Sequence, residues 1–205
     1  TDRLFGIING IDYFDYNPAS DKSLPKQYDW HTASEGKATN KLVLQEKLGL
    51  QVSKETPLFC ATSRITFQKG FSLIMGIMDW LLKQELQLII LGDGDAYYVD
   101  KLKGWQKQYP KRLVFLPYND YWQFEQLIYA GSDCLLLPSH HEPCGLNQLI
   151  AMRYGCVPIV RNVGGLNDTV TDYNPRTNHG TGFVFNNFSN IALYTAIIRA
   201  MEDFR

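Results

Sequence analysis

The sequence has no long apolar run, no excess of charge of either sign and few cysteines, and each absence excludes a class of protein. No stretch approaches the ~20 consecutive apolar residues that a membrane-spanning helix needs, and no secretory signal pattern opens the chain. The formal net charge is −1, which gives no electrostatic basis for binding nucleic acid or an anionic membrane. We therefore expect neither nucleic acid nor a membrane as a partner.

The cysteines form no Cys-x-x-Cys pair, and they lie within or beside apparent strands and turns. They are Cys60, Cys134, Cys144 and Cys156. This usage is typical of reduced, mostly buried thiols in a cytoplasmic protein. His140 and His141 are the other candidate metal ligands, but no third ligand follows at a suitable spacing, so we expect no metal site.

From residue 57 onward, short apolar runs alternate with helical patterns of ten or more residues. Strands are expected at 58–62, 88–91, 113–116, 133–137, 157–160 and 182–185, and helices at 35–48, 71–82, 96–109, 122–130, 145–154 and 191–204, with a further helical start at 166. This alternation predicts an α/β fold with a parallel sheet covered by helices on both faces. Residues 1–34 are expected to form an irregular lead-in, and residues 35–205 one domain.

Ligands of such sheets bind beyond the carboxyl ends of the strands, and residues 138–170 supply two successive strand-to-helix turns there. Backbone N–H groups at a helix start attract anions. Glu142 lies between the two turns, in a loop that we expect to be too tight to hide it. Amides beside a lone carboxylate suggest a phosphorylated ligand with a hydroxyl-rich part. The alternative for Glu142 is a helix-dipole contact.

Further candidates occupy other turns at this edge. Arg64 and Lys69, after the first strand, suit a diphosphate and its developing charge as a leaving group; alternatively they are solvated surface cations. Tyr118 could stack on a nucleobase or be an ordinary exposed aromatic. Gly164 and Gly165 could let the backbone approach a phosphate, or form only a tight turn.

One turn suggests two chemistries that the sequence argues against. Asp93-Gly94-Asp95 resembles a metal-holding Asp-x-Asp, but a polar turn is the favoured interpretation. A nicotinamide-binding Gly-x-Gly-x-x-Gly is also disfavoured, because Tyr97 stands where the third glycine belongs. A nicotinamide-dependent oxidoreductase is therefore only a remote alternative.

Seven motifs follow one another along nearly the whole chain. They are Gly-Ile-x-Asn-Gly-Ile-Asp (6–12), Glu-Gly-Lys (35–37), Ser-Arg-x-Thr-x-Gln-Lys-Gly (63–70), Ile-Tyr-Ala-Gly-Ser-Asp (128–133), Glu-Pro-Cys-Gly-Leu-x-Gln-Leu-x-Ala-Met-Arg-Tyr-Gly (142–155), Val-Pro-Ile-Val-Arg (157–161) and Gly-Gly-Leu-x-Asp-Thr-Val (164–170). In sequence and order they closely resemble the bacterial glycogen synthase and plant starch synthase family.

The resemblance implies a GT-B architecture, in which two Rossmann-like halves face each other across a cleft. This chain resembles the C-terminal, donor-binding half. The resemblance further implies that the N-terminal acceptor domain and a closing C-terminal helix lie outside this sequence. The family transfers glucose from ADP-glucose or UDP-glucose to the 4-hydroxyl of an α-1,4-glucan, with retention and without a metal or other cofactor. A cytoplasmic or, in a plant, plastid-stromal location is implied.

The resemblance also implies roles for individual residues. Arg64 and Lys69 would bind the departing diphosphate, and Glu142 would hold glucose hydroxyls. Other contacts to sugar, phosphate and base would come from Cys144, Gly145, Leu146, Gly164, Gly165 and Tyr118.

The sequence departs from the family pattern at several positions. Ile150 stands where many GT-B relatives carry a second, ribose-binding glutamate, and His140, His141 and Asn147 replace the common Arg, Phe and Thr. One alternative is another GT-B glycosyltransferase, such as a sucrose synthase-like enzyme, against which the Glu-Pro-Cys-Gly-Leu run and Ile150 argue. The other is a non-catalytic module that binds sugar nucleotide or glucan.

Overall fold

A computed structural model describes residues 5–204 of the chain and leaves residues 1–4 and 205 outside the description. Within that range the strands are β1 (Leu58–Thr62), β2 (Gln87–Leu91), β3 (Leu113–Leu116), β4 (Cys134–Leu137), β5 (Val157–Arg161) and β6 (Phe183–Phe185). The helices are α1 (Ala33–Lys47), α2 (Phe71–Leu81), α3 (Ala96–Gln108), α4 (Tyr118–Tyr121), the 3₁₀ helix η1 (Trp122–Phe124), α5 (Glu125–Gly131), α6 (Asn147–Arg153), α7 (Gly164–Thr169) and α8 (Asn190–Phe204).

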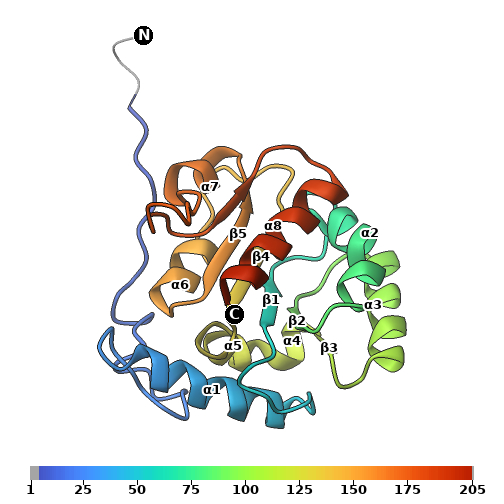
Figure 1. The fold of residues 1–205 in the computed structure, drawn as a ribbon, viewed down its shortest axis with the longest axis horizontal. Helices are drawn as coiled ribbons and strands as arrows, with labels where there is room; N and C mark the ends of the chain where they lie inside the picture. The colour runs from blue at the N-terminus through green and yellow to red at the C-terminus, as the bar shows by residue number, and fades with distance from the viewer. Residues whose placement is uncertain (1–4, 205) are drawn as a thin grey trace.

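The strands form one parallel sheet in the order β3-β2-β1-β4-β5-β6. Alternate residues of β1 point to opposite faces: Phe59 joins a core with α2 and α8, whereas Cys60 joins a core with α1, α5 and α6. Helices therefore cover both faces, as Figure 1 shows. The α/β prediction is confirmed, and the order reverses between β1 and β4, which makes the carboxyl ends of these two strands the topological switch point.

Most predicted elements occur within two residues of their expected bounds, and the differences have local causes. The range expected as one helix, 122–130, contains the 3₁₀ helix η1 followed by α5. The short helix α4 precedes them and begins after Pro117, which occupies its N-cap position. The helix expected from Gly145 starts two residues later, because Gly145 has φ +73° and is not helical. Conversely, α7 begins at the glycine pair itself rather than after it.

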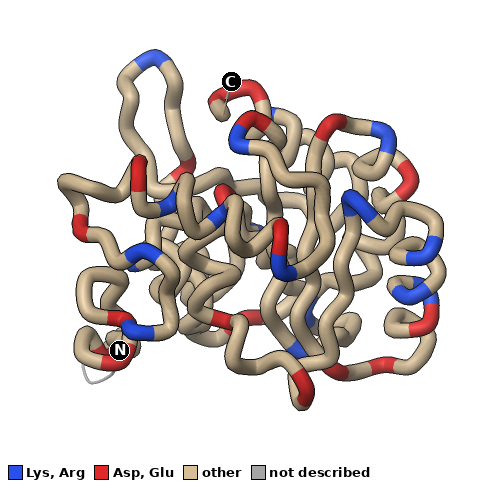
Figure 2. The backbone as a smooth tube through the Cα atoms, turned by 90° about the horizontal axis from the view of Figure 1, so that it is seen from below, with Lys and Arg blue, Asp and Glu red and all other residues tan. Residues whose placement is uncertain are grey.

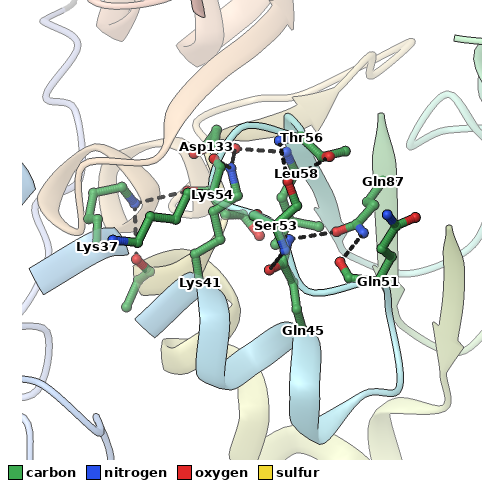
Figure 3. Close-up of polar contacts among 12 residues, drawn as sticks. Lys37, Lys41, Gln45, Gln51, Ser53, Lys54, Thr56, Leu58, Gln87 and Asp133 are labelled. Atoms are coloured by element: carbon green, nitrogen blue, oxygen red, sulfur yellow. Dashed lines mark hydrogen bonds and ion pairs between the residues drawn. The ribbon is translucent and has the colours of Figure 1, made fainter. Parts of the chain in front are cut away.

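Helix α1 is fastened to the amino edge of the sheet by buried polar groups (Figure 3). Lys37 Nζ donates to four backbone carbonyl oxygens, those of Tyr129, Ala130, Ser132 and Tyr154, at 2.9–3.2 Å. Burial lowers the pKa of Lys37, so its charged form depends on these acceptors.

The same helix carries a second buried cation. Lys41 Nζ pairs with Asp133 Oδ2 at 2.7 Å and also donates to the Lys54 carbonyl. Because Asp133 Oδ2 also accepts the Leu58 amide at 2.7 Å, this pair links α1 to the starts of both β1 and β4. One turn further along, Gln45 Nε2 donates to Gln87 Oε1 at the start of β2.

Residues 5–32 contain no helix or strand and run along one side of the body to its edge (Figure 1). Several of their large apolar side chains are exposed: Phe5, Ile7, Tyr13, Phe14 and Trp30. No helix within residues 5–204 is both long enough and apolar enough to cross a membrane. Figure 2 shows cationic and acidic residues interspersed along the backbone.

We predict that Lys37→Met destabilises the fold by about 3 kcal/mol, because four carbonyls lose their shared donor. The measurement is the free energy of unfolding in urea. Lys103→Met is the matched control, because Lys103 is exposed on α3, and it should change that free energy by less than about 0.5 kcal/mol. Equal effects of the two substitutions would contradict a structural role for the Lys37 contacts.

Candidate functional site

The loops that follow β1 and β4 meet at the switch point through an ion pair. Lys69 Nζ lies 2.5 Å from Glu142 Oε2, and the Ser139 hydroxyl donates to the same oxygen at 3.2 Å. Glu142 is only 7% exposed, so the expectation that its loop could not hide it is wrong. The pairing explains the difference, since a buried carboxylate is stable when it is paired and hydrogen-bonded.

The loop after β5 packs directly against the Glu142 loop, and the glycine pair makes this approach possible. A Cβ on Gly164 would lie 2.1 Å from the Glu142 carbonyl oxygen, and one on Gly165 would lie 2.1 Å from the Cys144 carbonyl oxygen. The Gly165 amide donates to the Glu142 carbonyl at 3.1 Å. The close contact in this structure is therefore between two backbone segments, and the Gly165 N–H is already paired.

Cys144, Gly145 and Leu146 form the turn that leads into α6. Gln148, in the first turn of that helix, donates through Nε2 to the carbonyls of Cys144 and Gly145 at 3.1 and 3.0 Å. These two hydrogen bonds hold the turn against the start of α6.

A second group of residues surrounds a pocket of about 270 Å³ at the same edge of the sheet. Its lining brings together Arg64, Tyr118 and Asn147, with Thr62, Ser63, Gly92, Asp93 and Glu125 completing it. Asn147 Nδ2 donates to the Thr62 carbonyl, so α6 closes one side of the pocket. The predicted site residues thus fall into two groups: Lys69, Glu142 and the glycines in one, and Arg64 and Tyr118 in the other.

Glu125 is a pocket residue that sequence analysis missed. Its Oε1 accepts from Tyr129 Oη at 3.3 Å and its Oε2 from Tyr118 Oη at 3.5 Å. Burial raises the pKa of Glu125 and also that of Tyr129. The predicted helix had Glu125 inside it, whereas the residue opens α5, and no motif marked it.

The Asp93-Gly94-Asp95 turn has structural tasks. Asp95 caps α3 by accepting the Tyr97 amide at 2.9 Å, and Asp93 Oδ2 accepts the Asn119 amide at 3.1 Å. No group of three or more His, Cys, Asp or Glu side chains in residues 5–204 is arranged to hold a metal ion. Cys144 is partly exposed, and the other three cysteines are buried and unbridged.

Comparison with known proteins identifies relatives for the whole chain. The family model for glycosyl transferases group 1 matches residues 45–204. The glycogen synthase of Trichodesmium erythraeum is 44% identical over 207 aligned positions, which cover 100% of this chain and 44% of that protein. The glycogen synthase of Thermotoga maritima is also 44% identical, over 97% of this chain and 40% of its own length. The chain therefore spans less than half the length of these relatives.

Solved structures agree with the fold. The catalytic domain of starch synthase IV from Arabidopsis thaliana, bound to ADP and acarbose, superposes with a TM-score of 0.88 at 34% identity, covering 100% of this chain and 42% of that one. Anabaena HepE in complex with UDP-glucose has a TM-score of 0.61 at 22% identity, over 80% of this chain and 43% of that one, which is a likeness of fold alone. The parallel sheet with its helices matches one half of a GT-B glycosyltransferase, as predicted.

We predict that Gly165→Ala lowers the free energy of unfolding by about 2 to 3 kcal/mol, because its Cβ would overlap the Cys144 backbone. Gly104→Ala is the matched control: a Cβ there meets nothing within 4 Å on α3, and alanine should stabilise the helix by about 0.5 to 1 kcal/mol. Urea unfolding of both variants is the measurement. A neutral Gly165→Ala would contradict the close approach of the two loops.

Proposed function

This chain belongs to the glycosyl transferase group 1 family, and we propose that it is the donor-binding domain of a retaining α-1,4-glucan synthase that uses ADP-glucose. The observation that carries the proposal is the Lys69–Glu142 pair at the switch point. It brings a cation suited to phosphate beside a carboxylate suited to sugar hydroxyls. The similarity to glycogen synthases and to the ADP-bound starch synthase supports the same donor.

Each site residue has a task in this proposal. Arg64 and Lys69 bind the diphosphate, and Lys69 exchanges Glu142 for a phosphate oxygen when the donor arrives. Glu142 then accepts hydrogen bonds from glucose hydroxyls. The turn amides of Cys144, Gly145 and Leu146 face the sugar and phosphate, with Gly164 and Gly165 behind them, and the Tyr118 ring lies against the base.

The reaction proposed is a front-face displacement at the anomeric carbon. The bond from C1 to the diphosphate oxygen breaks while a bond from C1 to the acceptor 4-oxygen forms on the same face, which retains the configuration. The proton of the acceptor hydroxyl passes to the departing phosphate. The protein contributes charge stabilisation of the leaving group through Arg64 and Lys69, and the proposal requires neither a protein nucleophile nor a metal or other cofactor.

The acceptor glucan is proposed to bind mainly to the half of the relatives that this chain does not span. The chain alone then has a donor site facing solvent where the full cleft has a second wall. We expect donor binding without elongation. The proposed setting is the cytoplasm, or the plastid stroma in a plant.

We predict that this chain binds ADP-glucose and that Arg64→Ala and Lys69→Ala each weaken binding at least about tenfold, through loss of charge-assisted phosphate contacts. Isothermal titration calorimetry gives the dissociation constants. Lys103→Ala on α3 is the charge-matched control and should bind as the wild type does. Unchanged affinity in both site variants would contradict the assigned phosphate contacts.

We also predict that the chain alone transfers no labelled glucose from ADP-glucose to glycogen under conditions in which donor binding is saturated. The physical reason is the absent acceptor wall, which is needed to hold the 4-hydroxyl against the anomeric carbon. Incorporation of label into precipitated glucan is the measurement. Elongation at a rate typical of an intact synthase would contradict the proposal that the acceptor binds outside this chain.

A further inference from the structure

Glu125 is a partly buried carboxyl group in the lining of the 270 Å³ pocket, and Arg64, the cation in that lining, forms no salt bridge with it. Among the described residues, no lysine, arginine or histidine nitrogen lies within 4.0 Å of its oxygens. Its protein contacts are the two tyrosine hydroxyls at 3.3 and 3.5 Å, both long for O–H···O bonds. A half-buried acid of this kind is costly to maintain unless something else donates to it.

The carboxylate has unused acceptor capacity that can serve a ligand. A carboxylate offers about four lone-pair positions, and the two tyrosines occupy two of them. The Tyr129 hydroxyl also forms a hydrogen bond of 2.5 Å with Thr62 Oγ1. Thr62 is the last residue of β1, so this bond fixes the Tyr129 side chain at the carboxyl end of that strand. The other tyrosine, Tyr118, is 43% exposed, so part of its side chain is available to a ligand, and its hydroxyl reaches Glu125.

The chemistry of the pocket favours a base that presents N–H groups. The Tyr118 hydroxyl reaches Glu125 Oε2, so a base that stacks on the Tyr118 ring and extends past this hydroxyl would meet the carboxyl group. Adenine presents an exocyclic amino donor at its edge. Uracil presents carbonyl oxygens on both sides of its single N–H. A carbonyl oxygen that faces a carboxylate oxygen places two hydrogen-bond acceptors against each other, which is unfavourable. The lining also contains a second carboxyl group, that of Asp93, and the Arg64 guanidinium, which the proposed function assigns to the diphosphate.

We propose that Glu125 is a specificity-determining residue of the donor site, which accepts a hydrogen bond from the 6-amino group of adenine and disfavours uracil. This inference rests on the proposed function, because it needs the nucleotide base to lie at Tyr118. Glu125 contacts the base and takes no part in the bond changes at the sugar.

The test is calorimetric titration of this chain and its variants with ADP, UDP and 2′-deoxy-ADP. Wild type should bind ADP at least about tenfold more tightly than UDP. Glu125→Ala should weaken ADP binding about tenfold and leave UDP nearly unchanged. Glu125→Gln keeps an acceptor oxygen and adds an amide donor for the uracil carbonyl, so it should retain ADP binding and strengthen UDP binding. Glu46→Ala, an exposed acid on α1, is the charge-matched control.

The outcomes separate this inference from the proposed function. Tight ADP binding with no change of the ADP-to-UDP ratio in either Glu125 variant leaves the donor site standing and overturns the inference. A loss that Glu125→Ala shows with ADP and UDP but not with 2′-deoxy-ADP assigns the carboxyl to the ribose and also overturns it. Failure of the wild type to bind any of the three contradicts the proposed function and the inference together. Thermal unfolding of each variant verifies that it is folded.

Discussion

The buried ammonium groups of α1 are the interaction on which the rest of the structure depends. Lys37 gathers carbonyls from the ends of α5 and α6 and from the segment before β4, and Lys41 joins the starts of β1 and β4 through Asp133 (Figure 3). These contacts fix the amino ends of the two strands whose carboxyl ends define the switch point. Contacts at the amino ends of β1 and β4 therefore help to position the loops that follow these two paired strands at their carboxyl ends.

The candidate site is a consequence of that geometry. Parallel strands in the order β3-β2-β1-β4-β5-β6 bring every strand-to-helix turn to one edge, and the glycine pair allows the turn after β5 to close onto the turn after β4. The result is one group of residues around Glu142 and a pocket around Tyr118, and Lys69 and Arg64 on one loop belong to the first and the second respectively. We propose that this group and this pocket together hold the nucleotide sugar, and that the acceptor binds outside this chain.

The sequence allowed the parallel sheet, its strand boundaries and the family to be predicted, because buried strands are continuous apolar runs and the motifs are local. It could not show that Lys69 and Glu142, which lie 73 positions apart, are paired, because such contacts depend on how the loops pack. The broken helix at 118–131 was missed because its 3₁₀ turn has no distinctive pattern. Glu125 was missed because no motif contains it and because its position in the pocket lining depends on how α5 packs.

The Lys69–Glu142 pair also bears on how the proposed donor site responds to small anions such as inorganic phosphate. Because Lys69 and Glu142 are paired with each other, inorganic phosphate can bind Lys69 only if Glu142 loses its ion-pair partner. An unpaired buried carboxylate is costly. In the proposed function, a nucleotide sugar supplies an anion for Lys69 and hydroxyl groups for Glu142 in one molecule, and so provides each side chain with a new partner. On this proposal, the ion pair favours a ligand that carries both an anionic group and hydroxyl groups over a ligand that carries an anionic group alone.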